Sequence, residues 1–156
     1  MRKLLKVAMA IAVAASFVIV PAEASKRRKR QRAPTLPPVV QVHVDISSQS
    51  MNVRVNGWNY GSWRVSTGRS GYYTPRGSYS VKRLARMHYS RKYDNAPMPH
   101  SVFFHGGYAI HATYQTRALG RPASHGCVRL APGNAAALYA LVQKHGASRT
   151  RIILTN

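Results

Sequence analysis

From residue 39 onward, hydrophobic and polar residues alternate along the chain. Residues 40–46 place valine or isoleucine at every second position, and residues 51–55 repeat this spacing. A period of two predicts strands that bury one face. Asn56 and Gly57 tolerate positive φ, which predicts a tight hairpin before a strand over residues 58–66. The sheet is therefore expected to begin antiparallel.

Further short strands are predicted over residues 78–84, 101–104, 108–111 and 150–154. Residues 85–100 are polar and irregular and contain Pro97 and Pro99. We expect a long loop there, which would serve either as a lid over a site or as a crossing connection.

Residues 132–145 carry the one convincing helical pattern, with an apolar stripe within residues 135–142 and Gly146 at the expected stop. The coarse count is seven or eight strands and one helix. The sequence thus predicts a mainly β domain, sandwich-like or barrel-like, with one packed helix. Residues 39–156 have the length of a single domain.

The N-terminus has the pattern of an export signal. Three basic residues within positions 1–6 precede an apolar run over residues 7–20, and Ala22 and Ala24 form a small-x-small cleavage pattern. These features predict a signal peptide over residues 1–24 and a location in the periplasm or cell envelope. An uncleaved leader is the alternative, although the apolar run is shorter than the roughly 20 residues that span a bilayer.

Cleavage would leave a strongly basic protein. The 24 basic residues lose three and the three acidic residues lose Glu23, which gives 21 against 2, or +19. This charge favours anionic partners, which in an envelope are lipids and wall polymers and not nucleic acid. The basic, proline-containing segment 25–38 cannot form a core, so we expect a disordered linker that is either an electrostatic anchor or a simple spacer.

The candidate chemistry centres on the only cysteine, Cys127, which lies sixteen residues after His111 and two after His125. A lone thiol in an exported protein is buried and inert, bridged to another chain, or kept free for its reactivity. The two histidines favour a reactive thiol.

Residues 124–130 are interpreted as a strand or its approach, which would project His125, Cys127 and Arg129 onto one face. If the strand over residues 108–111 pairs with it, the histidine that ends that strand meets Cys127.

This constellation fits acyl transfer, in which a thiolate attacks a carbonyl, a histidine moves the proton and backbone N–H groups hold the oxyanion. A positive field and a neighbouring His111 or His125 would lower the thiol pKa from about 8.5 to below about 6. The N–H groups of Gly126 and Cys127 are candidates for the oxyanion site. Arg129 offers a planar fork for a substrate carboxylate.

The thiol could instead be a small apolar core residue, half of a disulfide that links a dimer, or a zinc ligand. The zinc site would use His105, His111, His125 and Cys127, whose spacing matches none of the usual paired-ligand motifs. We therefore predict no metal and no cofactor.

His111, followed thirteen positions later by the start of the sequence Ser-His-Gly-Cys at residues 124–127, resembles the signature of the YkuD-type L,D-transpeptidase catalytic domain. Residues 65–68, 74–79 and 98–111 resemble other landmarks of this family, in the same order. The resemblance covers residues 39–154 and implies the family's mainly β fold, with the helix after the cysteine motif.

By this resemblance Cys127 is the nucleophile, His111 is the general base, and His125 shapes the oxyanion site together with the backbone of Gly126 and Cys127. Ser124 would brace that turn.

Two positions differ from residues common in the family. Ala112 stands where some members carry serine, so a backbone carbonyl is expected to orient His111. Arg129 stands where asparagine is frequent, which affects the substrate-carboxylate contact and not the nucleophile.

The resemblance also implies an envelope enzyme that acts on peptidoglycan stem peptides. The cysteine would attack the bond between the L-centre of diaminopimelate and D-alanine, release D-alanine and form a thioester. The acceptor amine would come from another stem peptide, giving a 3-3 cross-link, from an envelope protein, or from a D-amino acid. We expect a monomer. The alternatives are a hydrolase of the same fold and a noncatalytic basic module that binds anionic wall polymer.

Overall fold

The computed structural model describes residues 37–156. The predicted signal peptide and almost all of the predicted linker lie outside the described residues. No helix within residues 37–156 is long and apolar enough to cross a membrane. The elements in chain order are β1 (Val40–Asp45), β2 (Ser50–Val55), β3 (Trp58–Arg64), β4 (Gly77–Ser80), β5 (Arg83–Ser90), β6 (Ala96–His105), β7 (Tyr108–Ala112), η1 (Thr116–Ala118), β8 (Val128–Leu130), α1 (Pro132–His145), η2 (Ala147–Arg149) and β9 (Thr150–Thr155).

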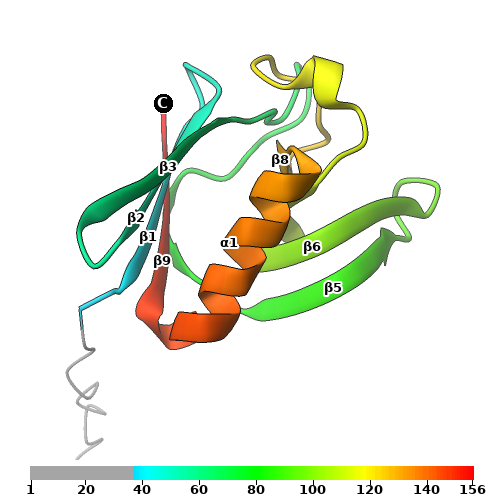
Figure 1. Ribbon diagram of the computed structural model, residues 1–156. Helices are drawn as coiled ribbons and strands as arrows, with labels where there is room; N and C mark the ends of the chain where they lie inside the picture. The colour runs from blue at the N-terminus through cyan, green and yellow to red at the C-terminus, as the bar shows by residue number, and fades with distance from the viewer. Residues whose placement is uncertain (1–36) are drawn as a thin grey trace, which may run out of the picture. The chain divides into compact units, whose positions relative to one another are not determined.

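The strands form two sheets, and helix α1 packs against strands β6 and β7 of the second (Figure 1). The five-stranded sheet has the order β3-β2-β1-β9-β4, and the four-stranded sheet has the order β5-β6-β7-β8. Valines on the inner side of β1 and β2, aliphatic residues of β9 and the apolar stripe of α1 share one core. The prediction of a mainly β domain with one packed helix is confirmed.

The alternating segments form strands as expected, and their registers follow the buried side chains. Val42 lies opposite Val53 in the antiparallel pair β1–β2, and opposite Ile152 in the parallel pair β1–β9. All three side chains are fully buried, because a period of two places every second residue on the core face. Helix α1 has the predicted bounds and stops at Gly146, whose φ is +91°.

The predicted long loop over residues 85–100 is wrong. Most of this segment forms the hairpin of β5 and β6, in which Pro97 lies opposite Tyr89 and Pro99 lies opposite Met87. Strand β7 pairs with β6 only from Val102 onward, so the proline-containing half of β6 has one edge without a strand partner. A proline, which has no N–H to donate, is tolerated at such an edge.

The predicted strand over residues 78–84 is divided between the two sheets. Strand β4 ends at Ser80, and β5 begins at Arg83 in the other sheet. Val81 between them is buried, and the Lys82 N–H donates to the carbonyl of Phe103 at 2.8 Å. The chain therefore changes sheets while its backbone groups stay paired.

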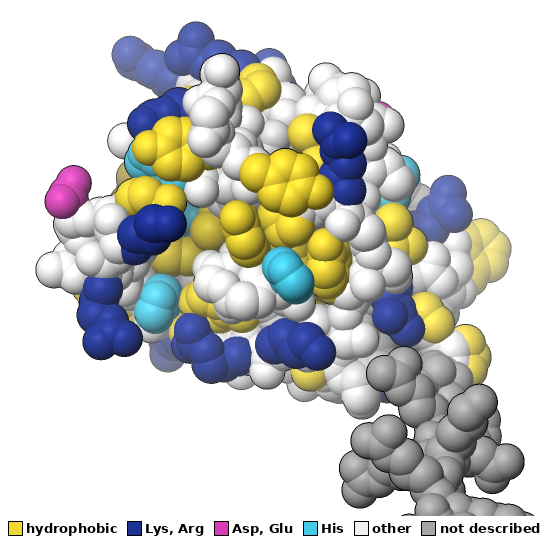
Figure 2. Space-filling view, turned by 180° about the vertical axis from the view of Figure 1, so that it is seen from behind, with side chains coloured by type: hydrophobic (Ala, Val, Ile, Leu, Met, Phe, Trp, Pro, Cys, Tyr) yellow, Lys and Arg dark blue, Asp and Glu magenta, His cyan; other side chains and the backbone are white. Residues whose placement is uncertain are grey.

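On the face of the described domain that Figure 2 shows, basic side chains are spread over the surface, whereas acidic ones are rare. Asp45 and Asp94 are the only acidic residues in positions 37–156. Asp45 accepts hydrogen bonds from Ser47 and Ser48, which lower its pKa to about 2. Few negative charges are therefore available to neutralise the arginines and lysines.

Candidate active site

Cys127 lies at the end of a turn that leads into strand β8, and the turn and β7 bring it beside His111. Strand β8 begins only at Val128, so within the segment interpreted as a strand or its approach, residues 128–130 form the strand and residues 124–127 form the approach. Ser124 forms an isolated bridge with Gly68 instead. Parallel pairing of β7 and β8 places Ile110 opposite Val128.

The turn is braced by two buried hydroxyl groups. The Ser124 Oγ accepts the Gly126 N–H at 2.9 Å and donates to the Cys127 carbonyl at 2.6 Å. On the other side, the Thr74 Oγ1 accepts the Gly68 N–H at 2.8 Å and donates to the Gly126 carbonyl at 2.9 Å. Each hydroxyl acts once as donor and once as acceptor, so the backbone groups of the turn are satisfied without strand pairing. This geometry agrees with the bracing role expected of Ser124.

Gly126 is required by both backbone conformation and space. Its φ is +114°, and a Cβ at this position would lie 2.6 Å from the Tyr73 carbonyl oxygen and 2.7 Å from the ring of Tyr108. No side chain fits there without displacing the backbone. Because Gly126 has no side chain, the backbone of the turn can lie close to the Tyr73 carbonyl and the Tyr108 ring.

The N–H of Gly126 is already donated to Ser124, so it does not face the pocket as an oxyanion donor. This differs from the expectation that Gly126 and Cys127 both contribute N–H groups. A serine two residues earlier accepts the Gly126 proton, an interaction that the sequence pattern alone did not reveal. Of these two backbone N–H groups, that of Cys127 remains as the candidate donor to the oxyanion.

His111 is in strand β7 with only 7% of its surface exposed. Its Nδ1 lies 2.7 Å from the Ala112 carbonyl oxygen. A carbonyl only accepts, so Nδ1 carries the proton and Nε2 is the free acceptor. The backbone carbonyl expected to orient His111 is thus that of Ala112. Burial lowers the pKa of His111 to about 4, more than the hydrogen bond to Ala112 raises it. His111 is neutral at neutral pH.

The Cys127 side chain is half-buried, and its thiol faces the Gly107 carbonyl oxygen at 4.0 Å. Burial raises the pKa of this thiol, whereas a hydrogen bond from the Ala109 backbone and the charge of Arg129 lower it by less. The expected lowering of the thiol pKa is therefore wrong in direction. The reason is desolvation, which disfavours the charged form of a buried thiol. Cys127 and His111 form a neutral pair.

Arg129 lies directly opposite His111 in the β7–β8 register. Its Nη1 donates to the Gln115 side-chain oxygen at 3.2 Å and to the Ala123 carbonyl at 3.4 Å. These contacts fix the guanidinium at the edge of the pocket and leave its other donors for a ligand.

His125 makes contacts that the sequence did not predict. Its ring stacks on Tyr93, with centroids 4.3 Å apart and planes at 11°, and meets Tyr72 edge-on at 4.6 Å. Tyr93 is at the tip of the β5–β6 hairpin, 32 positions earlier in the chain. In the sequence, Tyr93 is only an aromatic residue in the polar segment 85–100. This does not identify His125 as the residue that it contacts.

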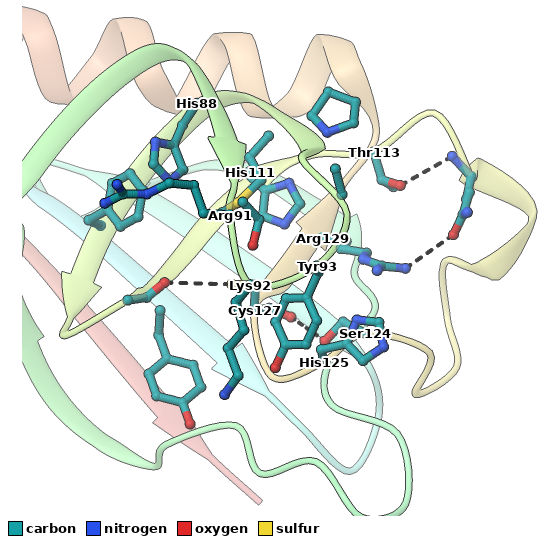
Figure 3. A pocket seen from close by; sticks show the side chains of 18 of the residues that line it. His88, Arg91, Lys92, Tyr93, His111, Thr113, Ser124, His125, Cys127 and Arg129 are labelled. Carbon is teal, nitrogen blue, oxygen red and sulfur yellow. Dashed lines mark hydrogen bonds between the residues drawn. The ribbon is translucent and has the colours of Figure 1, made fainter.

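These side chains line one pocket with a volume of about 590 Å³. His111, His125, Cys127, Arg129 and Ser124 all contribute to its wall, as Figure 3 shows, whereas Gly126 and Ala112 act through their backbone. His105 packs against Tyr79 and Tyr108 outside this pocket. Within residues 37–156, no group of three His, Cys, Asp or Glu side chains is placed to hold a metal, so the four residues of the zinc alternative do not converge.

Comparison with known sequences gives one family. The model of the YkuD family, described as the L,D-transpeptidase catalytic domain, matches residues 40–153. No match was found among curated proteins.

Solved structures of L,D-transpeptidases share the fold. The protein from Stackebrandtia nassauensis is 26% identical, with a TM-score of 0.66 over 85% of this chain and 62% of that one. The protein from Xylanimonas cellulosilytica is 28% identical, with a TM-score of 0.62 over 78% and 63%. L,D-transpeptidase 3 from Mycobacterium tuberculosis, solved with a faropenem-derived adduct, is 23% identical, with a TM-score of 0.66 over 76% and 61%. This chain spans about three fifths of the length of these proteins.

Proposed function

Because the chain belongs to the L,D-transpeptidase catalytic domain family, we propose that it is a cysteine-dependent L,D-transpeptidase that acts on peptidoglycan stem peptides. The observation that carries this proposal is a thiol and a buried imidazole in one pocket, with the imidazole held in a single tautomer. Cys127 and His111 line that pocket together, and Nδ1 of His111 is committed to the Ala112 carbonyl. Nε2 is therefore the nitrogen that takes the thiol proton.

The reaction begins from the neutral pair. As Sγ of Cys127 bonds to the substrate carbonyl carbon, its proton moves to Nε2 of His111, and the carbonyl oxygen becomes an oxyanion. The tetrahedral intermediate collapses, the proton passes from His111 to the leaving amine, and D-alanine departs. A thioester remains on Cys127. An acceptor amine then attacks the thioester and restores the thiol.

The remaining residues position this chemistry. The Cys127 N–H is the candidate oxyanion donor, and Ser124 holds the turn that presents it. Arg129 binds the carboxylate next to the scissile bond through the donors that Gln115 and Ala123 leave free. His125, stacked on Tyr93, forms the wall on the hairpin side.

The proposal includes the cellular setting. A protein with this activity works in the cell envelope, as the pattern of residues 1–24 predicts. Its basic surface and the basic segment 25–38 are proposed to attract anionic envelope polymers. We also propose that the protein is a monomer.

Intact-mass measurement after incubation with a carbapenem tests the nucleophile. One covalent adduct is expected on the wild-type protein and none on Cys127→Ala. A solved relative was crystallised with a faropenem-derived adduct, which makes a β-lactam a suitable probe. No adduct on the wild type, or an equal adduct on Cys127→Ala, would exclude Cys127 as the nucleophile.

The role of His111 needs a separate test. His111→Ala is expected to slow acylation by roughly 10² to 10⁴, the usual cost of losing a general base. Wild-type acylation rates in a folded His111→Ala protein would transfer the role to His125.

The identity of the acceptor is tested with a tetrapeptide donor, with and without an added amine. A transpeptidase forms the new amide only when the amine is present, and releases D-alanine in step with it. Shortened stems at equal rates with and without the amine would indicate the hydrolase. A noncatalytic module would leave the donor intact and bind wall polymer in a salt-dependent way that ignores Cys127→Ala.

A further inference from the structure

A second group of basic side chains lines the pocket apart from the residues assigned above. Arg83 and His88 come from strand β5, and Arg91 follows the end of that strand. Figure 3 shows His88 and Arg91 on one side of Cys127 and Arg129 on the other. None of the three residues takes part in the reaction or in the bracing of the turn.

An aromatic platform holds this group near the thiol. The Arg83 guanidinium lies over the Phe103 ring, 3.8 Å from its centroid, and the His88 ring meets the same phenylalanine edge-on at 5.1 Å. Phe103 in turn belongs to the small core cluster against which Cys127 packs. A guanidinium stacked on a ring keeps the N–H donors at its edge free for a planar anion. The platform thus fixes a donor fork relative to the nucleophile.

No negative charge in the pocket neutralises this group. Four of the lining residues are arginine or lysine, and none is acidic. Asp94, at the hairpin tip, does not line the pocket, and Asp45 is bound to its own turn. The pKa of His88 is lowered, first by burial and then by the charges of Arg83 and Arg91. The two guanidinium charges of Arg83 and Arg91 are unfavourable near each other without a counter-charge, and a bound anion would relieve this repulsion.

We infer that Arg83, His88 and Arg91 form a subsite for a carboxylate of the acyl donor, distinct from the carboxylate next to the scissile bond. The inference rests on the proposed function, because it specifies which stem peptides that site accepts. The substrate class is a stem peptide with a free carboxylate beyond the reacting carbonyl. Such a carboxylate is present on the diaminopimelate side chain or on the residue before diaminopimelate, and amidation at either position removes its charge.

Binding to the full-length Cys127→Ala protein tests the subsite without any reaction. Calorimetry would compare three tetrapeptides: one with both carboxylates free, one amidated on the diaminopimelate side chain and one amidated on the preceding residue. One amidation is expected to weaken binding at least tenfold and the other much less, which identifies the carboxylate. Increasing the salt concentration from 50 to 500 mM should weaken the free peptide most.

Substitutions identify the residues responsible. In the Cys127→Ala background, the double substitution Arg83→Gln and Arg91→Gln is expected to weaken binding of the free tetrapeptide. Its affinity should fall to that of the amidated tetrapeptide that binds weakly. The affinity of this amidated tetrapeptide should not change. Arg91→Gln alone, which lies outside the strands, gives a partial loss even if the double variant unfolds. Arg86→Gln is the matched control, because Arg86 is an exposed residue of the same strand that does not line the pocket.

Two outcomes overturn the subsite: equal binding of all three peptides, or equal losses in the Arg86→Gln control and the double variant. The carbapenem adduct on Cys127 separates this result from the proposed function. If the wild-type protein forms the adduct but all three peptides bind equally, only the subsite is excluded and the proposed function stands. If the free carboxylate is preferred but the wild-type protein forms no carbapenem adduct, the subsite is supported and Cys127 is excluded as the nucleophile.

Discussion

Tyr93 stacks face to face on His125, with ring centroids 4.3 Å apart. The two residues belong to segments that are distant in the chain, the tip of the β5–β6 hairpin and the turn before Cys127. Tyr72 meets both rings edge-on. Aromatic contacts therefore hold the hairpin tip against the wall of the pocket, and no hydrogen bond of the described residues joins Tyr93 to His125.

Tyr93→Ala is expected to lower kcat/KM for a tetrapeptide donor about tenfold, because an aromatic pair contributes about 0.5–1.5 kcal/mol beyond its buried area. Tyr93→Phe, which keeps the ring, should restore the value. Tyr89→Ala is the matched control, since Tyr89 is on the same hairpin, is 54% exposed and does not line the pocket. Steady-state kinetics with the three variants would contradict the prediction if the two alanine variants behaved alike.

Gly126→Ala is expected to destabilise the domain by roughly 2–4 kcal/mol and to abolish acylation, because a Cβ would meet the Tyr73 carbonyl oxygen in a backbone already at positive φ. Gly71→Ala isolates the backbone contribution, since Gly71 has φ +80° and a Cβ added there would have nothing within 4 Å. It should cost only about 1 kcal/mol. Urea denaturation of both variants measures the difference, and equal costs would show that the contact with Tyr73 is unimportant.

The Cys127 thiol is expected to be protonated in the resting protein, because burial raises its pKa. Its rate of alkylation by iodoacetamide should therefore rise with pH through a midpoint above the value of about 8.5 of a free thiol. Glutathione measured in parallel provides the reference. A midpoint below pH 7 would instead indicate a thiolate–imidazolium pair.

The stability of the domain is expected to fall on acidification from about pH 6.5 to pH 4. The pKa of His111 is about 4 in the folded protein, against an ordinary value of 6.5. Between these values the unfolded chain binds more protons, so the free energy of unfolding decreases as the pH falls. The difference corresponds to about 3 kcal/mol for this one group. Denaturation curves of wild type and His111→Gln at several pH values test it: the variant should show a clearly smaller slope, and an unchanged slope would assign the effect to other groups.

The fold was predictable where one face of an element is buried. The valines of β1 and β2 and the apolar stripe of α1 are local patterns, and each appears in the structure with nearly the expected bounds. The β5–β6 hairpin was not predictable in this way. The residues of β5 are partly exposed on both faces, and Pro97 and Pro99 of β6 resemble a loop until the missing partner strand along β6 is known.

The site was predictable in its reacting groups and not in their environment. Cys127 and His111 are recognisable from residue type and spacing, and the parallel pair β7–β8 brings them together. The raised thiol pKa, the engaged N–H of Gly126 and the stack of Tyr93 on His125 depend on burial and on contacts between distant segments. The order of residue types along the chain indicates neither the burial of a side chain nor its contacts with distant segments.

The position of β9 has a consequence for the order in which the domain can form. This last strand lies between β1 and β4 in the five-stranded sheet, parallel to the first strand and antiparallel to the other. During synthesis, β1 has one exposed edge and β4 has no partner in its sheet until residues 150–155 have emerged. Residues 150–155 complete the core on which the pocket residues reach their final positions. Almost the entire domain must therefore be synthesised before a molecule can become active.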